Sequence, residues 1–459
     1  MFWSVDWYRV IGSIREEMQR EDKMPLTIIG GGLAGCEAAW QAVRIGVRVQ
    51  LLEMKPLRFS PAHHSPLLAE LVCSNSFRSQ DLESAVGLLK EEMRRLGSLV
   101  MEAAKANPVP AGKSLSVDRQ EFSRYITEKI TTHPLVSIIH QEVSVLPRDH
   151  PLILASGPLT TDELADDLKH LIGSDHLHFY DAIAPIVYWD SIDVNKTFRG
   201  SRYGHGGEDY INCPMSRQEY DFFYEQLVNA EQVPLHSFEE VHYFEGCLPI
   251  EVMAQRGRDT LRFGPMKPVG LSDPRTGNIP YAVVQLRQDN QEGTLYNIVG
   301  FQTKLKWKEQ ERIFRLIPGL EQAEFTRLGS IHRNTFVNGP EVLLPTLQLK
   351  TAPRIFLAGQ ITGVEGYVES SAIGIMAGIN AARFLQNKSL VIPQATTAMG
   401  VLTAYVSQQP KKDFQPMNIN FGLFSPIMGK VPRRLRGKTY AERALADLRV
   451  WMEEIKKDE

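Results

Sequence analysis

The feature that most constrains this chain is a glycine-rich turn between an apolar strand and a helix of small residues. Gly30, Gly32 and Gly35 occupy the three glycine positions of a GxGxxG motif. The first glycine of such a motif permits a tight turn, the second lets a pyrophosphate approach the backbone, and the third lets the helix pack against the strand. The helix start at Leu33 and Ala34 would direct free N–H groups at the phosphate.

An acidic residue stands where this motif requires one. After the helix, residues 47–52 read as a second strand, and Glu53 ends it, 18 residues after Gly35, where a carboxylate can bind a pair of ribose hydroxyls. The alternative is an ordinary glycine turn without a ligand. Such a turn does not require a strand before it, a helix after it and an acidic residue at the end of the next strand, all of which are present here. We therefore predict a dinucleotide site formed by Gly30, Gly31, Gly32, Leu33, Ala34, Gly35 and Glu53.

Length and composition fit a large enzyme. The 459 residues suffice for two or three domains, and a net charge of −3 excludes a globally basic nucleic-acid binder, though not a local basic patch. The sequence contains no run of about 18 apolar residues, so no membrane span is predicted. Residues 1–23 carry charges and lack an apolar signal core, so we expect a cytoplasmic protein. The four cysteines have no CxxC spacing, so neither a disulfide framework nor a metal site is expected.

The pattern along the chain predicts a discontinuous nucleotide domain. Residues 81–106 read as one long amphipathic helix, 118–131 as another helix, and 151–157 as a buried strand. Prolines, aromatics and short strand-like runs such as 182–188 and 281–286 then indicate an inserted domain with a mixed sheet. The fold class we predict is α/β, a Rossmann-like FAD-binding domain with an inserted α+β substrate domain, divided as 1–23 (extension), 24–180 and 321–459 (FAD-binding), and 181–320 (inserted).

A second strand–glycine–helix unit near the C-terminus brings the chain back to the nucleotide domain. Residues 354–360 form an apolar strand ending in glycine, and a small-residue helix is expected at 370–385. Only one GxGxxG motif occurs, so the chain has one site of this kind for a tightly bound dinucleotide. This favours FAD bound in the first domain and NAD(P)H that binds only transiently. We expect the late unit to present backbone amides to the flavin at Gly359, Gln360, Gly363 and Gly366.

Two of the four cysteines are candidates for chemistry. Cys73 and Cys247 lie in loop-like segments beside Ser/Asn or Gly/Pro residues, where a thiol can be exposed yet fixed. A thiolate can add to an electron-poor C=C bond. The alternative for each is a small buried apolar residue. Cys36 lies inside the dinucleotide helix and is expected to serve packing, whereas Cys213 is open to either interpretation.

Several long strings resemble the folate- and FAD-dependent tRNA uracil-5-methyltransferase family (TrmFO). The resemblance runs from about residue 24 to the C-terminus, and residues 1–23 depart from it. The strings that carry it are LVCSNS (71–76), FEGCLPIE (244–251), TLRFGPMKPVGL (260–271), HRNTF (332–336) and GQITGVEGY (359–367).

The resemblance implies a reaction and roles for both cysteines. A thiolate would add to C6 of the T-loop uridine of tRNA, making C5 nucleophilic toward the methylene carbon of methylenetetrahydrofolate. Reduced FAD would convert methylene to methyl, giving 5-methyluridine, and NAD(P)H would restore the flavin. By resemblance Cys247 is the thiol that adds to C6, and Cys73 acts on the flavin side as methylene relay or base.

Basic segments are candidates for tRNA contacts. The C-terminal run 429–438 holds five basic and no acidic residues, and further arginines surround the string at 260–271. A solvated face is the alternative for any such run. The candidates for tRNA contacts are Arg258, Arg262, Arg433, Arg434, Arg436 and Lys438.

Two other functions are compatible with parts of this pattern. One is a related FAD-dependent enzyme that modifies the wobble uridine of tRNA, because residues 359–367 suit both families. The other is a non-catalytic, flavin-containing RNA-binding protein. No protein partner and no membrane contact is indicated by the sequence.

Overall fold

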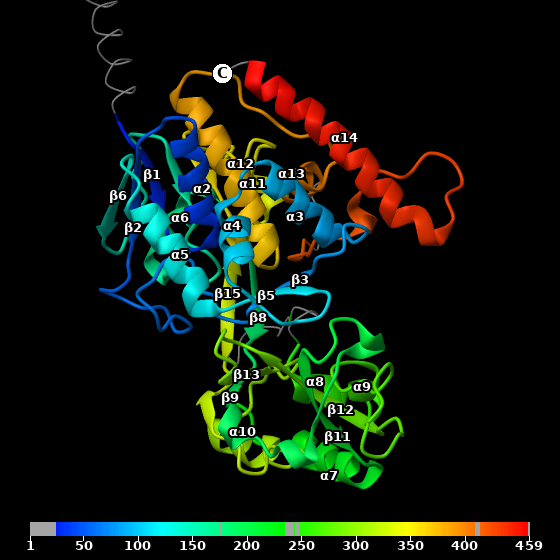
Figure 1. Cartoon of the computed structure of the whole chain (residues 1–459). Helices are drawn as coiled ribbons and strands as arrows, with labels where there is room; N and C mark the ends of the chain where they lie inside the picture. The colour runs from blue at the N-terminus through cyan, green and yellow to red at the C-terminus, as the bar shows by residue number, and fades with distance from the viewer. Residues whose placement is uncertain (1–23, 174–176, 235–242, 244–247, 409–413, 458–459) are drawn as a thin grey trace, which may run out of the picture.

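The computed structural model describes residues 24–173, 177–234, 243, 248–408 and 414–457. They form two bodies joined by a two-stranded ribbon (Figure 1). The N-terminal extension predicted at residues 1–23 and the candidate Cys247 lie outside the described residues.

A five-stranded parallel sheet forms the centre of the larger body. The strand order is β16-β7-β1-β2-β6, with β1 in the middle. Alternate residues enter opposite cores: Ile28 and Leu51 face one cluster, whereas Ile29 and Leu52 face the other. Because both faces are covered, the strands read as continuous apolar runs. Their bounds are β1 Leu26–Ile29, β2 Val49–Glu53, β6 Val136–His140, β7 Leu152–Leu154 and β16 Ile355–Leu357.

Helices cover both faces of this sheet. The core on one face receives most of them, and the opposite face is packed by α6 (Asp162–Ile172). A small sheet of β3 (Ser76–Ser79), β4 (Pro108–Val109) and β5 (Ser114–Val117) lies toward the second body. The helices of the larger core are α2 Leu33–Arg44, α3 Ala85–Arg95, α4 Leu99–Ala106, α5 Arg119–Thr131, α12 Tyr367–Leu385, α13 Ala398–Ser407 and α14 Arg436–Lys457, with the short α11 Gly339–Val342 beside α13.

The prediction of a single helix at residues 81–106 is wrong. The chain forms α3 and α4 instead, separated by Gly97 at φ +71°. Ser98 then begins α4 by accepting a hydrogen bond from the Met101 N–H, and the buried Glu37 carboxylate accepts bonds from Leu99 and Val100 N–H. A glycine followed by a serine N-cap is a stop-and-start signal, which the continuous apolar periodicity obscured.

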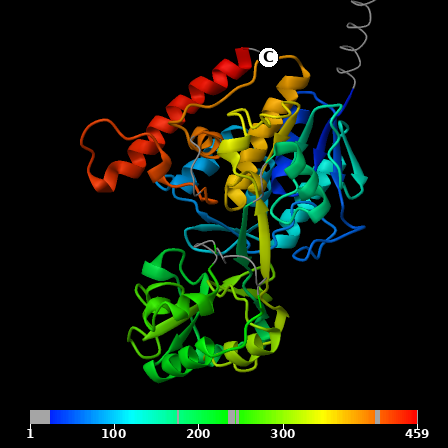
Figure 2. The same cartoon turned by 180° about the vertical axis from the view of Figure 1, so that it is seen from behind.

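The second body is built on a six-stranded sheet of order β10-β11-β12-β13-β9-β14 with its own apolar core. It hangs below the larger body in both views (Figures 1 and 2). Its strands are β9 Ile186–Tyr188, β10 Phe198–Arg199, β11 Tyr210–Met215, β12 Ala282–Gln288, β13 Leu295–Ile298 and β14 Phe325–Arg327, and its helices are α7 Arg217–Val228, α8 Ile250–Gln255, α9 Thr260–Phe263 and α10 Trp307–Phe314.

The two connections to the larger body pair with each other. They are β8 (Leu177–Ala182) and β15 (Ile331–Phe336), which run antiparallel. The strand predicted at 182–188 is therefore two strands, β8 and β9, because Pro185 interrupts the run. One other boundary differs by a few residues: α12 begins at Tyr367, whereas the sequence pattern predicted a start at 370.

The architecture confirms the predicted class, an α/β Rossmann-like domain interrupted by an α+β insertion. Among the described residues, no helix combines the length and the apolar character needed to cross a bilayer.

The close contact between α2 and α12 yields a first prediction. A Cβ added at Gly378 would lie 2.5 Å from the backbone oxygen of Ala38. We therefore expect Gly378→Ala to lower the free energy of unfolding by about 1–3 kcal/mol through overpacking, although alanine favours a helix more than glycine does. Denaturant unfolding measures this. Gly200→Ala is the matched control, because its Cβ would meet nothing nearer than 3.7 Å, and equal stability of the two variants would contradict the prediction.

Candidate dinucleotide and active site

The three motif glycines have different steric surroundings. Gly30 adopts φ +102°, and a Cβ there would lie 2.5 Å from the oxygen of Ala155, the residue that directly follows the neighbouring strand β7. A Cβ at Gly35 would overlap the Gly30 oxygen. Around Gly32, by contrast, no atom lies within 4 Å of the Cβ position, and Gly32 is the N-cap of α2. Gly30 and Gly35 therefore permit packing, while Gly32 leaves open the space that a pyrophosphate needs.

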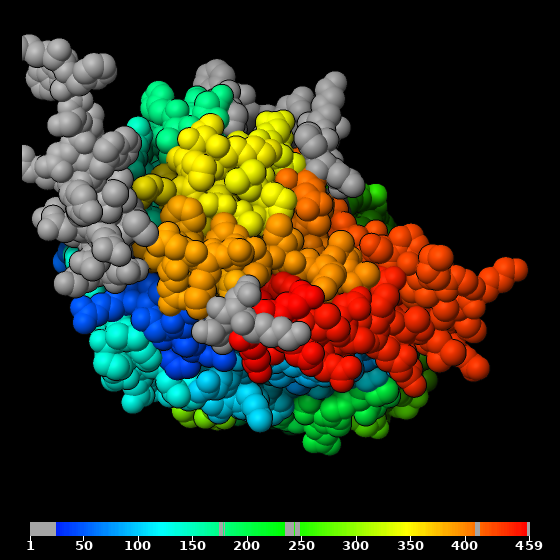
Figure 3. Space-filling model, turned by 90° about the horizontal axis from the view of Figure 1, so that it is seen from above, coloured from blue at the N-terminus to red at the C-terminus, as the bar shows by residue number. Residues whose placement is uncertain are grey.

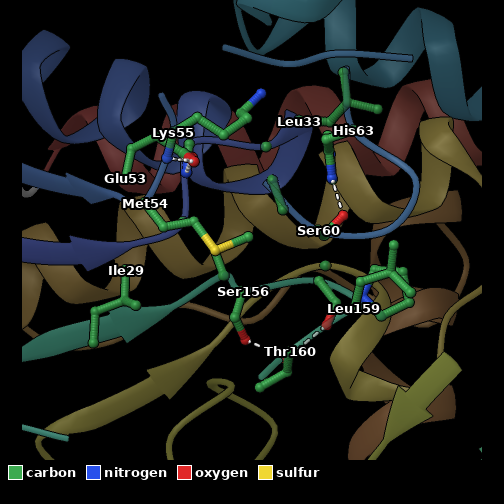
Figure 4. A pocket seen from close by; sticks show the side chains of 18 of the residues that line it. Ile29, Leu33, Glu53, Met54, Lys55, Ser60, His63, Ser156, Leu159 and Thr160 are labelled. Atoms are coloured by element: carbon green, nitrogen blue, oxygen red, sulfur yellow. Dashed lines mark hydrogen bonds between the residues drawn. The ribbon is translucent and has the colours of Figure 1, made fainter. Parts of the chain in front are cut away.

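Glu53 is fixed beside the glycine turn. Its buried carboxylate accepts hydrogen bonds from Gly31 N–H (2.7 Å) and Lys55 N–H (2.9 Å), and Figure 4 shows it turned toward the loop. A Cβ at Gly31 would lie 2.8 Å from the Glu53 Oε2 atom, so glycine is needed there too. The carboxylate has further lone pairs with which to accept ribose hydroxyls.

These residues line a cavity that encloses about 1150 Å³ of non-protein space, open solvent included. Side chains fixed by hydrogen bonds stand at its walls: Ser60 with His63 (2.5 Å) and Ser156 with Thr160 (2.7 Å) (Figure 4). Burial lowers the pKa of His63 to about 4, so this imidazole is neutral at physiological pH. The size of the cavity and the hydrogen-bonded polar side chains at its walls suit a dinucleotide. The lining also includes Gly30, Gly31, Gly32, Leu33, Ala34, Glu53, Val72, Gly359, Gln360 and Tyr367.

The late glycines divide into two kinds. Gly359 and Gln360 line the cavity, as a flavin-contacting unit would. Gly363 and Gly366 are not among the lining residues: Gly363, at φ +95°, turns the chain against the Phe414 ring, and Gly366, at φ +100°, is the N-cap of α12. Their positive φ angles explain the glycines without a ligand.

The loop that carries Cys73 borders this cavity. Val72 lines the cavity, and the half-buried Cys73 follows it. The phenol oxygen of Tyr367, another lining residue, accepts hydrogen bonds from Cys73 N–H (2.8 Å) and Ser74 N–H (3.2 Å). Cys73 Sγ lies 3.8 Å from the Ala182 oxygen, at the end of β8. One thiol is thus fixed between the cofactor domain and the ribbon.

Two arginines, the buried Arg287 and the half-buried Arg327, connect this loop to the inserted domain. Arg287 donates to Asn75 Oδ1 (2.9 Å) and Ser74 Oγ (2.8 Å). Arg327 donates to the Val72 oxygen (2.9 Å) and the Cys73 oxygen (3.1 Å).

A third arginine comes from the cofactor domain. Arg119 pairs with Asp289 of the inserted domain at 2.8 Å and donates to the oxygens of Leu71 (2.5 Å) and Cys73 (3.1 Å). No local sequence pattern indicates these partners, because they come from distant segments.

Cys36 and Cys213 differ from Cys73 in that both are fully buried. Burial raises the pKa of the Cys36 thiol, which donates to the Gly31 oxygen, and of the Cys213 thiol on β11, so both are packed, protonated side chains. Cys247 stays a prediction. Of its neighbours, Tyr243 pairs with Tyr180 on β8, and Leu248 is buried.

The candidate tRNA-binding residues fall into two groups. Arg258 pairs with Asp221 (2.9 Å), and Arg262 pairs with Asp259 (2.8 Å) and stacks 3.6 Å from the Tyr281 ring centroid. The C-terminal group is exposed: Arg433, Arg434, Arg436 and Lys438. The segment that leads into α14 projects from the body (Figure 3), so we call residues 429–438 the basic arm.

The open space at Gly32 yields a second prediction. Its φ of −75° suits any residue, so Gly32→Ala should fold normally. The added methyl would occupy the pyrophosphate space, so we expect a loss of cofactor affinity of about tenfold or more. Flavin absorbance of the purified protein measures this, and Gly200→Ala should retain the cofactor. Normal flavin content in Gly32→Ala would overturn the assignment of this site.

Comparison with known proteins identifies the family. A family model described as "Glucose inhibited division protein A" (GIDA) matches residues 25–389. Proteins described as "Methylenetetrahydrofolate--tRNA-(uracil-5-)-methyltransferase TrmFO" are 61% identical in Geobacter sulfurreducens (93% of this chain, 98% of the relative), 62% in Geotalea uraniireducens (94% and 99%) and 58% in Heliobacterium modesticaldum (94% and 98%).

A solved structure of Aquifex aeolicus GidA matches with a TM-score of 0.67 and 17% identity, over 94% of this chain and 75% of that chain. At that identity the likeness shows the fold alone, and it agrees with the Rossmann-like class. The relatives confirm the resemblance seen in the sequence strings: the chain belongs to the methylenetetrahydrofolate--tRNA-(uracil-5-)-methyltransferase TrmFO family.

Proposed function

We propose that this protein transfers the methylene carbon of methylenetetrahydrofolate to C5 of the T-loop uridine of tRNA and reduces it to a methyl group. Relatives at 58–62% identity, matched over nearly their whole length, support this activity over wobble-uridine modification. The structural observation that carries the proposal is the placement of the half-buried Cys73, whose backbone N–H donates to Tyr367 beside the dinucleotide cavity that Val72 and Tyr367 line.

The cavity residues fit FAD. Gly32 leaves room for the pyrophosphate, the Glu53 carboxylate can take the ribose hydroxyls, and Gly359 with Gln360 would face the flavin end. When bound, FAD in its reduced form would supply a hydride, that is, two electrons and a proton. NAD(P)H would then restore the reduced form of the flavin.

The cysteines perform the covalent steps of the proposed reaction. The Cys247 thiolate forms a bond to C6 of uracil, and the C5=C6 electrons shift to C5, which attacks the methylene carbon as one of its two bonds to folate nitrogen breaks. The C5 proton then passes to a base, for which Cys73 is the candidate, and its electrons expel the second folate nitrogen, which leaves an exocyclic methylene at C5. A hydride added to this methylene makes the methyl group, and the electrons that return to C5=C6 release the sulfur from C6 as the Cys247 thiolate.

The basic arm is the candidate surface for the tRNA backbone. It projects on the same side of the molecule as α9 in Figures 1 and 2. Among the described cations of the arm, only Lys438 forms an ion pair with a carboxylate, at 3.9 Å between its Nζ atom and Oε1 of Glu442. Arg258 and Arg262 are bound to acids of their own domain, which favours a bracing role for them.

The cysteine roles give a third prediction. The holoenzyme with unmodified tRNA, labelled methylenetetrahydrofolate and NADPH should form labelled 5-methyluridine, detected by nucleoside analysis. Cys247→Ala should retain FAD and its reduction by NADPH but lose methylation. Cys73→Ala should also lose methylation, and the double variant should be no worse than either single one, because both thiols serve one reaction.

A covalent trap separates the two cysteine roles. tRNA containing 5-fluorouracil cannot lose its C5 substituent as a proton, so an adduct between protein and RNA should survive denaturation and require Cys247. An adduct that persists in Cys247→Ala and vanishes in Cys73→Ala would reverse the roles. Cys213→Ala, a buried thiol, is the control. A non-catalytic RNA-binding protein would bind tRNA and form no labelled nucleoside in any variant.

The basic arm gives a fourth prediction. Changing Arg433, Arg434 and Arg436 together to Gln should weaken tRNA binding and reduce the slope of log K against log salt by about 2 to 3. Binding titrations at several salt concentrations measure this, while flavin reduction by NADPH should not change. Arg124→Gln with Lys129→Gln, on α5 at the other side of the cofactor domain, is the control. An unchanged slope would identify the arm as a solvated face.

A further inference from the structure

Tyr203 is an exposed aromatic residue held in an unfavourable backbone conformation. Its side chain is 61% exposed, and its φ of +59° places it in the left-handed region, which a residue with a bulky side chain seldom adopts. Strain of this kind persists where surrounding contacts impose it, and it concentrates at functional sites.

Contacts with the string at residues 260–271 impose this conformation. Tyr203 N–H donates to the Gly270 oxygen (2.8 Å), and a Cβ at Gly270 would lie 2.9 Å from the Tyr203 ring. The preceding Arg202 donates to Gln285 Oε1 (2.9 Å) and to the Val269 oxygen (3.2 Å). The ring is therefore positioned against Gly270 before any ligand arrives, with much of its surface open to solvent.

The same string presents a second aromatic side chain. Phe263, the last residue of α9, is 83% exposed, although Leu261 and Met266 on either side of it are buried in the core of the inserted domain. These two anchors fix the backbone while the Phe263 ring remains in water. Two exposed rings thus flank one anchored segment.

The location of the rings connects them to the proposed active site. Arg202 contacts Gln285 on β12, and Arg287, two residues further along this strand, bonds Ser74 in the loop of Cys73. α9, which ends at Phe263, lies on the side of the molecule to which the basic arm projects (Figure 1). Residues 255–271 contain four basic and one acidic side chain, but Arg258 and Arg262 are paired with Asp221 and Asp259, so the positive charge that favours an anionic partner comes from the basic arm on this side.

We propose that Tyr203 and Phe263 form a stacking surface for unpaired bases of the tRNA loop that carries the target uridine. Sequence-tolerant recognition of looped RNA stacks splayed bases on aromatic rings, while cations elsewhere bind the phosphates. The basic arm supplies those cations, and the two rings take bases next to the uridine that enters the active site. This inference rests on the proposed function and names side chains that hold its substrate.

The test compares an RNA hairpin of the T arm with a blunt duplex of the same stem, using the holoenzyme. Tyr203→Ala and Phe263→Ala should each weaken hairpin binding about 5- to 150-fold, the range for loss of one stacked base. Duplex binding and the salt slope should not change. Tyr203→Phe should bind as the wild type does. Trp307→Ala is the control, because Trp307 is 69% exposed on α10, at the other side of the inserted domain.

A second variant separates stacking from folding. Tyr203→Gly removes the ring and relieves the positive φ, so it should be at least as stable as the wild type and still lose hairpin affinity. Unchanged hairpin affinity in Tyr203→Gly and Phe263→Ala, with wild-type methylation of tRNA, would overturn the stacking surface alone. Equal losses on hairpin and duplex would also overturn it. A wild-type protein that neither binds nor methylates tRNA would overturn the proposed function as well.

Discussion

Three guanidinium groups, one buried and two half-buried, hold the loop of Cys73 between the two domains. Arg119, Arg287 and Arg327 surround it, and burial lowers the pKa of Arg327 to about 10. Charges in such a place destabilise a fold unless they are paired and hydrogen-bonded. The Asp289 carboxylate pairs with Arg119, and carbonyl oxygens of the loop accept hydrogen bonds from Arg119 and Arg327. The position of the thiol thus depends on contacts between domains, and a small rotation of the inserted domain would disturb it.

The cofactor cavity depends on a different constraint, the close approach of backbones. Gly30 lies against β7, and Gly35 lets α2 begin directly over the Gly30 carbonyl. Gly374 and Gly378 then bring α12 against the same helix at Ala34 and Ala38. Because every contact is with main chain, no side-chain movement can make room for a larger residue. Gly32 is the exception, and its open surroundings distinguish a ligand-contacting glycine from a packing one.

Buried carboxylates organise the helices around this cavity. Glu37 accepts the first N–H groups of α4, and Glu92 accepts those of Ala398 and Met399 at the start of α13. Burial raises the pKa of Glu92 to about 8 and that of Glu37 to about 7. A carboxylate at a helix N-terminus satisfies groups that the helix cannot bond itself. The sequence shows these residues as ordinary helical glutamates, since their partners are far away along the chain.

The sequence by itself determined the features that adjacent residues encode. The strand, turn and helix around Gly30–Gly35, the acid at Glu53, the second strand before Gly359 and the cysteine strings could all be identified, because their meaning lies in local spacing and backbone sterics. Tertiary structure decided which of those residues work together. Tyr367 bonds Cys73 across 294 residues, and Arg287 bonds Ser74 across 213. It also placed Gly363 in a turn and Gly366 at the N-cap of α12, and it divided the helix expected at 81–106. It paired Arg258 and Arg262 with acids and left Tyr203 and Phe263 exposed to solvent. Local patterns fix backbone conformation, whereas the pairing of buried charges depends on how distant segments meet.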